Sequence, residues 1–338
     1  MAKKVSKSSK SVKSTHAKKI KKSTRVTSSK NKHVVKSQKV DRLKIKAIKL
    51  PKLTYKRAVK TMVIVAVILL GFAGWGWWKF VFTNPDRLMS DMLDGSLQVS
   101  SVTKVVAQNT PQSSGLQAVR LGFAPGHYTH ILTQIHQPTG TVATETVGTK
   151  TTDFFRYKAI NTSDSITNLD EIINVWGEQK ADKAKGVEAT ALNQAVLTIV
   201  PFGNLNHQDR AAITDKFKRK DVYHIDSSSL EWSGLRPRVV YDVSINPKDV
   251  IEVLREYATV TGVGDVSQLN PSDYENARKL VAQFTIDPWS RQLISINYGE
   301  AGRIETYTGY GVRDHISYRL PQPTVSMDKI QVRTQEKP

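Results

Sequence analysis

An uncharged apolar run from Thr61 to Trp78 divides this chain into two parts of different electrical character. The first 60 residues hold 22 Lys and Arg and a single acidic residue, Asp41, so they carry a charge of +21. Of the 50 basic and 30 acidic residues in the chain, the remainder holds 28 and 29, a charge of −1. Because basic segments stay on the cytoplasmic side of a membrane helix, this asymmetry predicts a cytoplasmic N-terminus, one span and an extracytoplasmic C-terminal domain.

The apolar run is the predicted transmembrane helix, with bounds at residues 59–82. Its uncharged part is at the short end for a span, and Phe80 to Phe82 extend it to the ~20 residues that a bilayer requires. Basic side chains and indoles favour the headgroup layer. The residues predicted to lie at the membrane interface are Arg57, Lys60, Trp75, Trp77, Trp78 and Lys79. Cleavage of a signal peptide after Ala73 is the alternative, but its basic n-region would be unusually long.

Residues 1–58 are rich in Lys and Ser and poor in apolar residues, which predicts a disordered cytoplasmic tail. Its expected partners are the lipid bilayer and anionic lipid headgroups. DNA affinity of the tail is a further hypothesis, but nucleic acid is the less favoured partner because the basic excess is confined to this segment. The chain has no Cys, which fits a bacterial envelope protein and excludes a lipid-modified Cys, a thiol nucleophile or a Cys-ligated metal in it.

Residues 84–338 have the composition of one large globular domain, with a second sub-domain from about residue 220 left open. Asn-Pro pairs at 84–85, 246–247 and 270–271 predict helix starts, because Asn caps free N–H groups and Pro at the first helical position needs no partner. The predicted helices cover 85–95, 247–261 and 271–279, with further helical patterns at 169–176, 184–200 and 206–218.

Period-2 stretches rich in Val, Thr, Ile and Tyr predict the strands of this domain. They lie at 99–108, 116–123, 127–137, 141–147, 153–160, 220–225, 238–245, 280–286, 292–298, 303–310 and 315–319. Short turns between consecutive strands favour antiparallel pairing, since parallel strands need a crossover each time. The expected class is α+β, with a curved, half-barrel-like antiparallel sheet and helices on one face, preceded by the single membrane helix and the tail.

Sequence motifs of catalysis or metal binding are absent from this domain. His127, His130 and His136 are close together but lack metal-ligand spacing, and we interpret them as surface or sheet-face residues. The acidic residues on predicted strands, which we interpret as a solvated sheet face, are Glu145, Asp153, Asp242 and Glu305. We therefore predict no enzyme activity, no cofactor and no metal site, and keep a cell-wall hydrolase with spatially paired carboxylates as the least favoured hypothesis.

A strand-rich domain with amphipathic helices on one face makes an apolar cavity a natural expectation. The weak candidates for ligand contacts are aromatic residues near the expected rim of that cavity. They are Phe154, Phe155, Tyr241, Trp289, Tyr298 and Tyr307.

Four segments carry a resemblance to a known superfamily. They are Ser100–Thr103 after the first helix, Val239–Val243, Phe284–Asp287 and Leu293–Ile296. In this order, over residues 85–320, the chain resembles the lipoprotein-carrier superfamily, which implies a half-barrel with a helical lid that holds acyl chains. The chain departs from that pattern by its anchor, where the family has a lipid-attached Cys, and by extra helical material at 168–218. It also resembles membrane-anchored bacterial envelope proteins with Lys/Ser-rich N-termini.

These observations favour a single-pass, membrane-anchored extracytoplasmic domain that binds a lipid or other hydrophobic ligand, or an envelope protein through the same concavity. The alternative is a non-catalytic structural or assembly module of the cell envelope. No residue in the sequence identifies the ligand.

Overall fold

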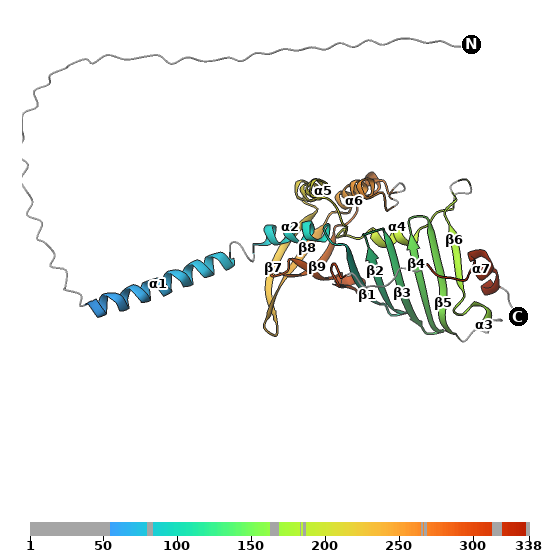
Figure 1. Ribbon diagram of the computed structural model, residues 1–338, viewed down its shortest axis with the longest axis horizontal. Coiled ribbons are helices and arrows are strands. Elements are labelled where there is room, and N and C mark those ends of the chain that lie inside the picture. The colour runs from blue at the N-terminus through green and yellow to red at the C-terminus, as the bar shows by residue number, and fades with distance from the viewer. Residues whose placement is uncertain are drawn as a thin grey trace, which may run out of the picture. The chain divides into compact units, whose positions relative to one another are not determined.

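The computed structural model describes residues 55–79, 84–162, 169–182, 184, 187–264, 266, 269–312 and 320–335. The predictions for residues 1–54, for Phe80–Phe82 and for a strand at 315–319 lie outside these ranges. The first described element, α1 (Tyr55–Trp77), is one helix of 23 residues (Figure 1). Within the described residues, the segment Val59–Trp77 is the one helix long and apolar enough to cross a membrane, and none of it is buried.

Twelve strands form a single open sheet in the described part of the chain, in the order β12-β6-β5-β4-β3-β2-β1-β11-β10-β9-β8-β7. All neighbouring pairs are antiparallel except β12 and β6. The strands are β1 (Ser101–Asn109), β2 (Ser114–Gly122), β3 (Tyr128–Gln137), β4 (Gly140–Thr149), β5 (Thr152–Thr162), β6 (Trp176–Lys180), β7 (Tyr223–Ser233), β8 (Arg236–Ile245), β9 (Leu280–Asp287), β10 (Gln292–Asn297), β11 (Arg303–Thr308) and β12 (Thr324–Ser326). The α+β class and the antiparallel character are as predicted.

The sheet joins the two halves of the chain. Strands β1 to β5 form a meander, β7 and β8 form a hairpin at the far edge, and β9 to β11 return so that β11 pairs with β1. Strands from before and after residue 220 therefore belong to the same sheet. The sequence analysis had kept a second sub-domain beginning at about that residue as a possible alternative. Two short elements at the C-terminal end, β12 and α7 (Met327–Gln335), lie against β6 at the opposite edge and were not predicted.

The longer helices of the globular part gather along one face of the sheet (Figure 1). They are α2 (Pro85–Ser96), α4 (Ala191–Val196), α5 (His207–Arg219) and α6 (Pro247–Thr261), while α3 (Leu169–Ile172) and the 3-10 helices Pro271–Tyr274 and Gly299–Ala301 are short. Alternate residues of β8, such as Tyr241 and Val243, share one buried cluster with Met92 of α2 and Tyr257 of α6. This face of the sheet, called the helix-covered face below, carries the hydrophobic core.

Three helix predictions are confirmed at both ends to within one residue, those of α2, α5 and α6. The Asn84 side chain accepts a hydrogen bond from the Arg87 backbone N–H at 3.0 Å, and Asn246 accepts one from the Lys248 N–H at 3.2 Å. Gly262 ends α6 in the left-handed conformation, φ 61°, which glycine adopts without strain.

Three helix predictions were wrong in extent. The third Asn-Pro pair starts only a 3-10 turn, Pro271–Tyr274, instead of a helix to residue 279. The helix predicted at 169–176 ends at Ile172, since Trp176 begins β6 and its ring lies 4.4 Å from the Arg156 guanidinium. The helix predicted at 184–200 is reduced to α4. Its last predicted residues are β-branched, and the Thr198 hydroxyl bonds the Val200 carbonyl at 2.6 Å instead of continuing the helix.

The serine segment at residues 227–229 lies inside β7. The Ser227 hydroxyl donates to the Asp242 carboxylate at 2.5 Å across the hairpin, and Ser228 and Ser229 pair with β8. Strand β7 is therefore much longer than the predicted 220–225.

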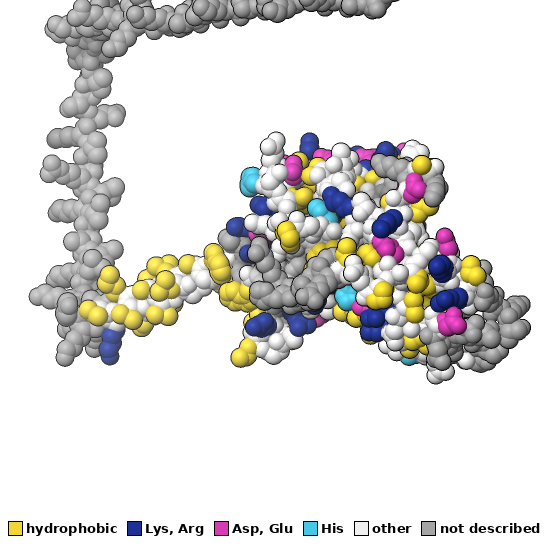
Figure 2. All heavy atoms as spheres, turned by 45° about the vertical axis from the view of Figure 1, so that its right-hand side comes forward, with side chains coloured by type: hydrophobic (Ala, Val, Ile, Leu, Met, Phe, Trp, Pro, Cys, Tyr) yellow, Lys and Arg dark blue, Asp and Glu magenta, His cyan; other side chains and the backbone are white. Residues whose placement is uncertain are grey.

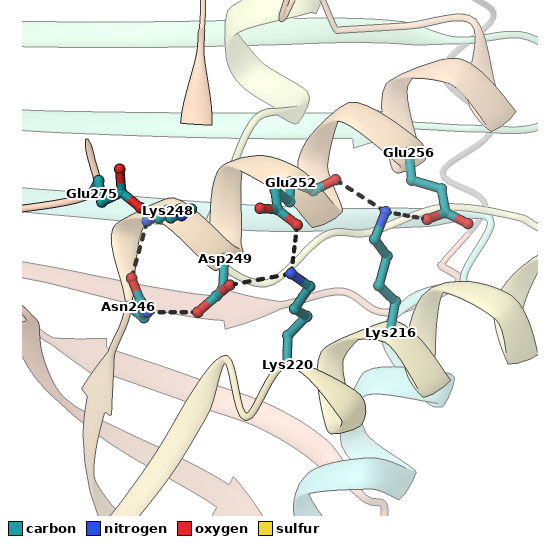
Figure 3. A network of polar contacts seen from close by, with 8 residues as sticks. All are labelled: Lys216, Lys220, Asn246, Lys248, Asp249, Glu252, Glu256 and Glu275. Carbon is teal, nitrogen blue, oxygen red and sulfur yellow. Dashed lines mark hydrogen bonds and ion pairs between the residues drawn. The ribbon is translucent and has the colours of Figure 1, made fainter. Parts of the chain in front are cut away.

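The outward side of α5 and α6 is joined by ion pairs (Figure 3). Lys216 lies 2.6 Å from Glu256, and Lys220 lies 2.8 Å from Glu252 and 3.8 Å from Asp249. Lys248 at the start of α6 lies 2.9 Å from Glu275. These contacts fix α5 beside α6, and through α2 they fix both over the β7–β10 half of the sheet.

Candidate functional site

A cavity of about 500 Å³ lies on the helix-covered face, where α4 and the segment that follows it cross the middle of the sheet. Its lining residues come from β1, β2, β3, β9, β11 and the connection between β10 and β11 on one side, and from the segment 191–199 on the other. They are Lys104, Gln117, Val119, Ile131, Ala191, Gln194, Ala195, Leu197, Thr198, Ile199, Leu280, Tyr298, Ala301, Arg303 and Glu305. This volume is within the range of small-molecule sites.

The cavity has two chemically different parts. Apolar side chains of β2, β3 and the 191–199 segment provide most of the wall, while β1 and β11 bring three charged groups, Lys104, Arg303 and Glu305. A second hollow of about 240 Å³ shares Gln117 and Arg303 with the first and continues past Val106 and Ile135. The two hollows are therefore neighbours, with the polar side chains of Gln117 and Arg303 between them.

Lys104 is the most unusual residue of this site. It alternates with Val102 and Val106 on the buried side of β1, and only 6% of it is exposed. In the part of the chain that the structure describes, its ammonium group takes part in no hydrogen bond and no ion pair within 4 Å. Burial lowers the pKa of Lys104, the Glu305 carboxylate opposes this, and Arg303 adds to it. The body of the Lys104 side chain is thus buried in the sheet, while its ammonium group reaches the cavity without a partner among the described residues, which is unusual for a core position of a strand and calls for an explanation.

Glu305, in contrast, is satisfied by its own strand. It is 2% exposed, accepts a hydrogen bond from the Arg303 Nε at 3.1 Å, and receives the hydroxyl of Tyr307. Burial and the nearby Glu305 charge raise the pKa of Tyr307, so this hydroxyl stays protonated and donates. With Glu305 paired to Arg303, the charge of Lys104 remains uncompensated, and the cavity offers a net positive site to a ligand.

The roof of the cavity is held down by two close contacts. The Asp153 carboxylate on β5 accepts hydrogen bonds from the backbone N–H groups of Thr190, at 2.7 Å, and Ala191, at 3.0 Å, at the start of α4. Gly148 on β4 lies directly beneath α4, because a Cβ there would be 2.9 Å from both the Ala191 Cβ and the Leu192 backbone N. The glycine thus allows the helix backbone to approach the sheet.

The structure brings two of the six aromatic candidates to this cavity. Tyr298 lines it, and Tyr307 donates to its Glu305 and stacks on Phe202 with ring centroids 5.2 Å apart. The other four lie elsewhere: Tyr241 is fully buried in the core, Phe154 is buried on β5, Phe155 contacts the Tyr157 ring, and Trp289 is 61% exposed beyond β9. Sequence reasoning missed Lys104, although a lysine between two core valines of an alternating strand was a visible signal.

The solvated sheet face predicted for the acidic candidates is wrong for three of the four, since Glu145, Asp153 and Glu305 are buried. Glu145 on β4 and Asp153 on β5 lie on adjacent strands, but Asp153 pairs with Gly148, three positions from Glu145, so the two side chains point to opposite faces of the sheet. Asp242 on β8 and Glu305 on β11 are separated by two intervening strands. Each is held by its own donors. Glu145 accepts from Arg156 Nε and bonds His130 Nε2, both at 2.8 Å. The structure therefore assembles no pair of these carboxylates.

The histidine cluster is divided between separate contacts. His130 bonds Glu145, and His136 Nδ1 lies 2.8 Å from the Thr141 hydroxyl. Burial, with a contribution from Lys150, lowers the pKa of His127. No group of three or more His, Cys, Asp or Glu side chains that could hold a metal ion occurs among the residues described.

The C-terminal end of α1 carries the aromatic residues predicted for the membrane interface. Trp75 and Trp77 are 59% and 50% exposed, and the Lys79 ammonium lies 5.5 Å from the centre of the Trp75 ring. Lys60 is exposed near the N-terminal end of α1. The side chain of Arg57 is not among those that the structure describes. This helix is exposed, uncharged from Thr61 to Trp77 and ends in tryptophans, so it is long and apolar enough to cross a membrane.

This chain was compared with protein families, with curated proteins and with solved structures. No family model and no curated protein matches this chain. The crystal structure of LprF from Mycobacterium bovis is similar to it with a TM-score of 0.38 and 13% sequence identity, over 72% of this chain and 99% of that one.

Proposed function

We propose that this protein is a single-pass, membrane-anchored extracytoplasmic domain that binds an amphiphile, an apolar chain bearing one oxyanion, in the cavity between the sheet and α4. The observation that carries the proposal is the ammonium group of Lys104, a residue that is mostly buried, which faces this cavity with no partner among the described residues. An oxyanion beside Lys104 would supply the missing charge-assisted hydrogen bond.

The remaining wall fits the rest of such a ligand. Val119, Ile131 and Leu197 offer apolar contacts next to Lys104, and the second hollow extends this space along the sheet. Burying an acyl chain there would release water from both surfaces, at about 0.8 kcal/mol for each methylene group buried. The oxyanion can be a carboxylate or a phosphate ester, because both bind an ammonium group. We also propose that the sheet curves around the ligand as a half-barrel, which is the shape predicted from the sequence.

The test uses the full chain extracted from membranes in mild detergent, with bound lipid extracted and identified by mass spectrometry. We expect a stoichiometric anionic amphiphile, and we expect Lys104→Met to lower its occupancy at least tenfold. Lys180→Met is the matched control, since that lysine on β6 is exposed and outside the cavity. Fatty acid in the extract would assign a carboxylate, and phospholipid a phosphate. Equal lipid content in the Lys104→Met and Lys180→Met proteins would refute the proposal.

The anchor is tested separately. If α1 is a retained span with the basic tail inside, protease added to intact cells or right-side-out vesicles should digest residues 84–338 and spare the N-terminal segment. Digestion of the N-terminus alone would reverse the proposed orientation. A mature chain that begins after Ala73 would show that the helix is removed.

A second candidate function, a non-catalytic assembly module, is favoured by the face of the sheet opposite the helices. Leu116, Leu132 and Ile304 lie on this face of neighbouring strands and are 48%, 40% and 45% exposed. Site-specific crosslinking from Leu116 in cells distinguishes the two functions, because an assembly module has one reproducible protein neighbour there.

A further inference from the structure

The β7–β8 hairpin carries large apolar side chains that the fold leaves uncovered. Leu230 and Trp232 are 41% and 62% exposed near the end of β7, and Leu235 in the turn is 96% exposed. In Figure 2 the hairpin projects at the lower left of the globular part, with hydrophobic atoms at its end and basic side chains above them. Exposed apolar groups gathered in one place mark an interaction site.

This end of the hairpin extends beyond the sheet. Strand β9 pairs with β8 only from Val239 to Ile245, whereas β7 and β8 continue to pair up to Ser233 and Arg236. Among the described residues, the part of the hairpin between Val239 and the turn therefore forms a two-stranded ribbon without a third strand or a covering helix (Figure 1). Such a ribbon is marginal in water by itself, so a partner that covers its apolar side chains would stabilise it.

The charges beside the turn indicate what kind of surface the hairpin meets. Arg236 and Arg238 follow Leu235 on β8, and Glu231 is the one acidic residue from 230 to 238, so the tip carries +1. Apolar and indole side chains near the end, with arginines one and three residues after Leu235, match the layering of an anionic lipid surface.

The position of the hairpin can be compared with that of α2, which directly follows the short connection from the proposed span. Six residue steps separate Trp78 from Asn84, which limits their separation to about 22 Å. The first half of α2 and the start of β7 share one hollow, lined by Met89, Ser90 and Ile225 among others. Helix α2, which follows the proposed span, and the β7–β8 hairpin thus lie at the same edge of the sheet.

We propose that the tip of the β7–β8 hairpin, Leu230 to Arg238, inserts its Trp232 and Leu235 side chains into the outer leaflet of the membrane to which the domain is tethered. This contact rests on the proposed anchor, but not on the ligand. It would give the domain a second attachment to the bilayer and hold the sheet at a fixed tilt above the lipid surface.

The absence of Cys from the chain makes a direct test available. A nitroxide is attached to Leu235→Cys in the full chain, reconstituted into phosphatidylcholine vesicles with and without phosphatidylglycerol. Its accessibility to oxygen and to a water-soluble nickel complex is measured by electron paramagnetic resonance. Leu132→Cys, an exposed leucine on β3, is the matched control. Both sites are exposed, so neither label should disturb folding, which thermal melts verify.

We expect the label at 235 to be several-fold more accessible to oxygen than to the nickel complex in vesicles that contain phosphatidylglycerol, and the label at 132 to show the reverse. Arg236→Gln combined with Arg238→Gln should reduce the difference. A label at 235 that is as accessible to nickel as the control would overturn the proposal. A label inaccessible to both reagents would also overturn it, because it would indicate a protein partner. Neither result would contradict the proposal that a ligand binds at Lys104, because the two proposals rest on different residues.

Discussion

Lys104 and Glu305 face the same cavity from β1 and β11, yet the carboxylate pairs with Arg303 and Tyr307 and leaves the lysine without an ion pair. Both residues are more than nine-tenths buried. A fold selected for stability alone would pair these two charges or replace the lysine with an apolar residue. The arrangement instead keeps one positive charge inside the domain, where it is unfavourable to stability and suited to an anionic ligand.

Lys104→Met should therefore stabilise the ligand-free domain. Replacing a buried unpaired charge by an apolar side chain of similar length is expected to raise the free energy of unfolding by about 1–3 kcal/mol. Burial lowers the pKa of Lys104 from about 10.5, so the unfolded chain binds more protons at this site and wild-type stability rises with pH up to that value. The advantage of the variant should thus shrink as pH approaches 10.5. Urea denaturation at several pH values measures it, and a variant less stable than wild type at neutral pH would contradict the argument.

The approach of α4 to the sheet depends on Gly148. Gly148→Val would place side-chain atoms where Ala191 and Leu192 lie, forcing α4 away and opening the cavity roof. Overpacking of this kind is expected to lower the free energy of unfolding by about 1–3 kcal/mol. Ligand occupancy should fall as well, since the 191–199 segment forms one wall of the cavity. Gly126→Val is a control, because nothing lies within 4 Å of a Cβ at that position. Equal melting temperatures for the two variants would show that the contact is unimportant.

The predictions from the sequence were correct where local signals determine the structure, and they were wrong where contacts between distant residues determine it. Asn246-Pro247 and Gly262 delimit α6 because capping is a property of a few adjacent residues. The late start of α4 is associated with Asp153, which lies 38 positions before Ala191 and accepts a hydrogen bond from its backbone N–H. The cavity around Lys104 was not predicted for a related reason. Lys104 pairs with Tyr307, 203 residues later in the chain, and no local sequence pattern predicts such a pairing.

Arg156 should be important on the opposite face of the sheet, where it holds Glu145 and lies over the Trp176 ring. Arg156→Leu is expected to lower the free energy of unfolding by about 2 kcal/mol, since it removes charged hydrogen bonds and a cation–π contact. Lys158→Met, a change at a more exposed lysine 3.6 Å from Glu145, should change it by less than about 0.5 kcal/mol.

The effect of Arg156→Leu should depend on pH in a defined direction. Burial opposes ionisation of Glu145, but hydrogen bonds from Arg156 and His130 outweigh it and lower its pKa below the ordinary 4.5. The stabilisation is therefore complete above pH 4.5 and is lost as pH falls through the lowered pKa in the folded state. Denaturation curves from pH 7 down to pH 3 should show the two proteins converging. A difference that persists at the acid end would assign the effect to packing on Trp176.

The two Asn-Pro helix starts at Asn246 and Asn270 offer a matched test of capping. Asn246 caps a 15-residue helix and also donates to Asp249 at 2.5 Å, whereas Asn270 caps a single 3-10 turn. Asn246→Ala should lower the free energy of unfolding by about 1 kcal/mol, and Asn246→Ser should recover most of it, because the hydroxyl can accept the same backbone N–H. Asn270→Ala should have a smaller effect, since the turn it caps has no buried residue. If the two alanine variants proved equally destabilised in chemical denaturation, the cap would not distinguish α6 from the 3-10 turn, and the longer helix would owe its extent to packing against the core alone.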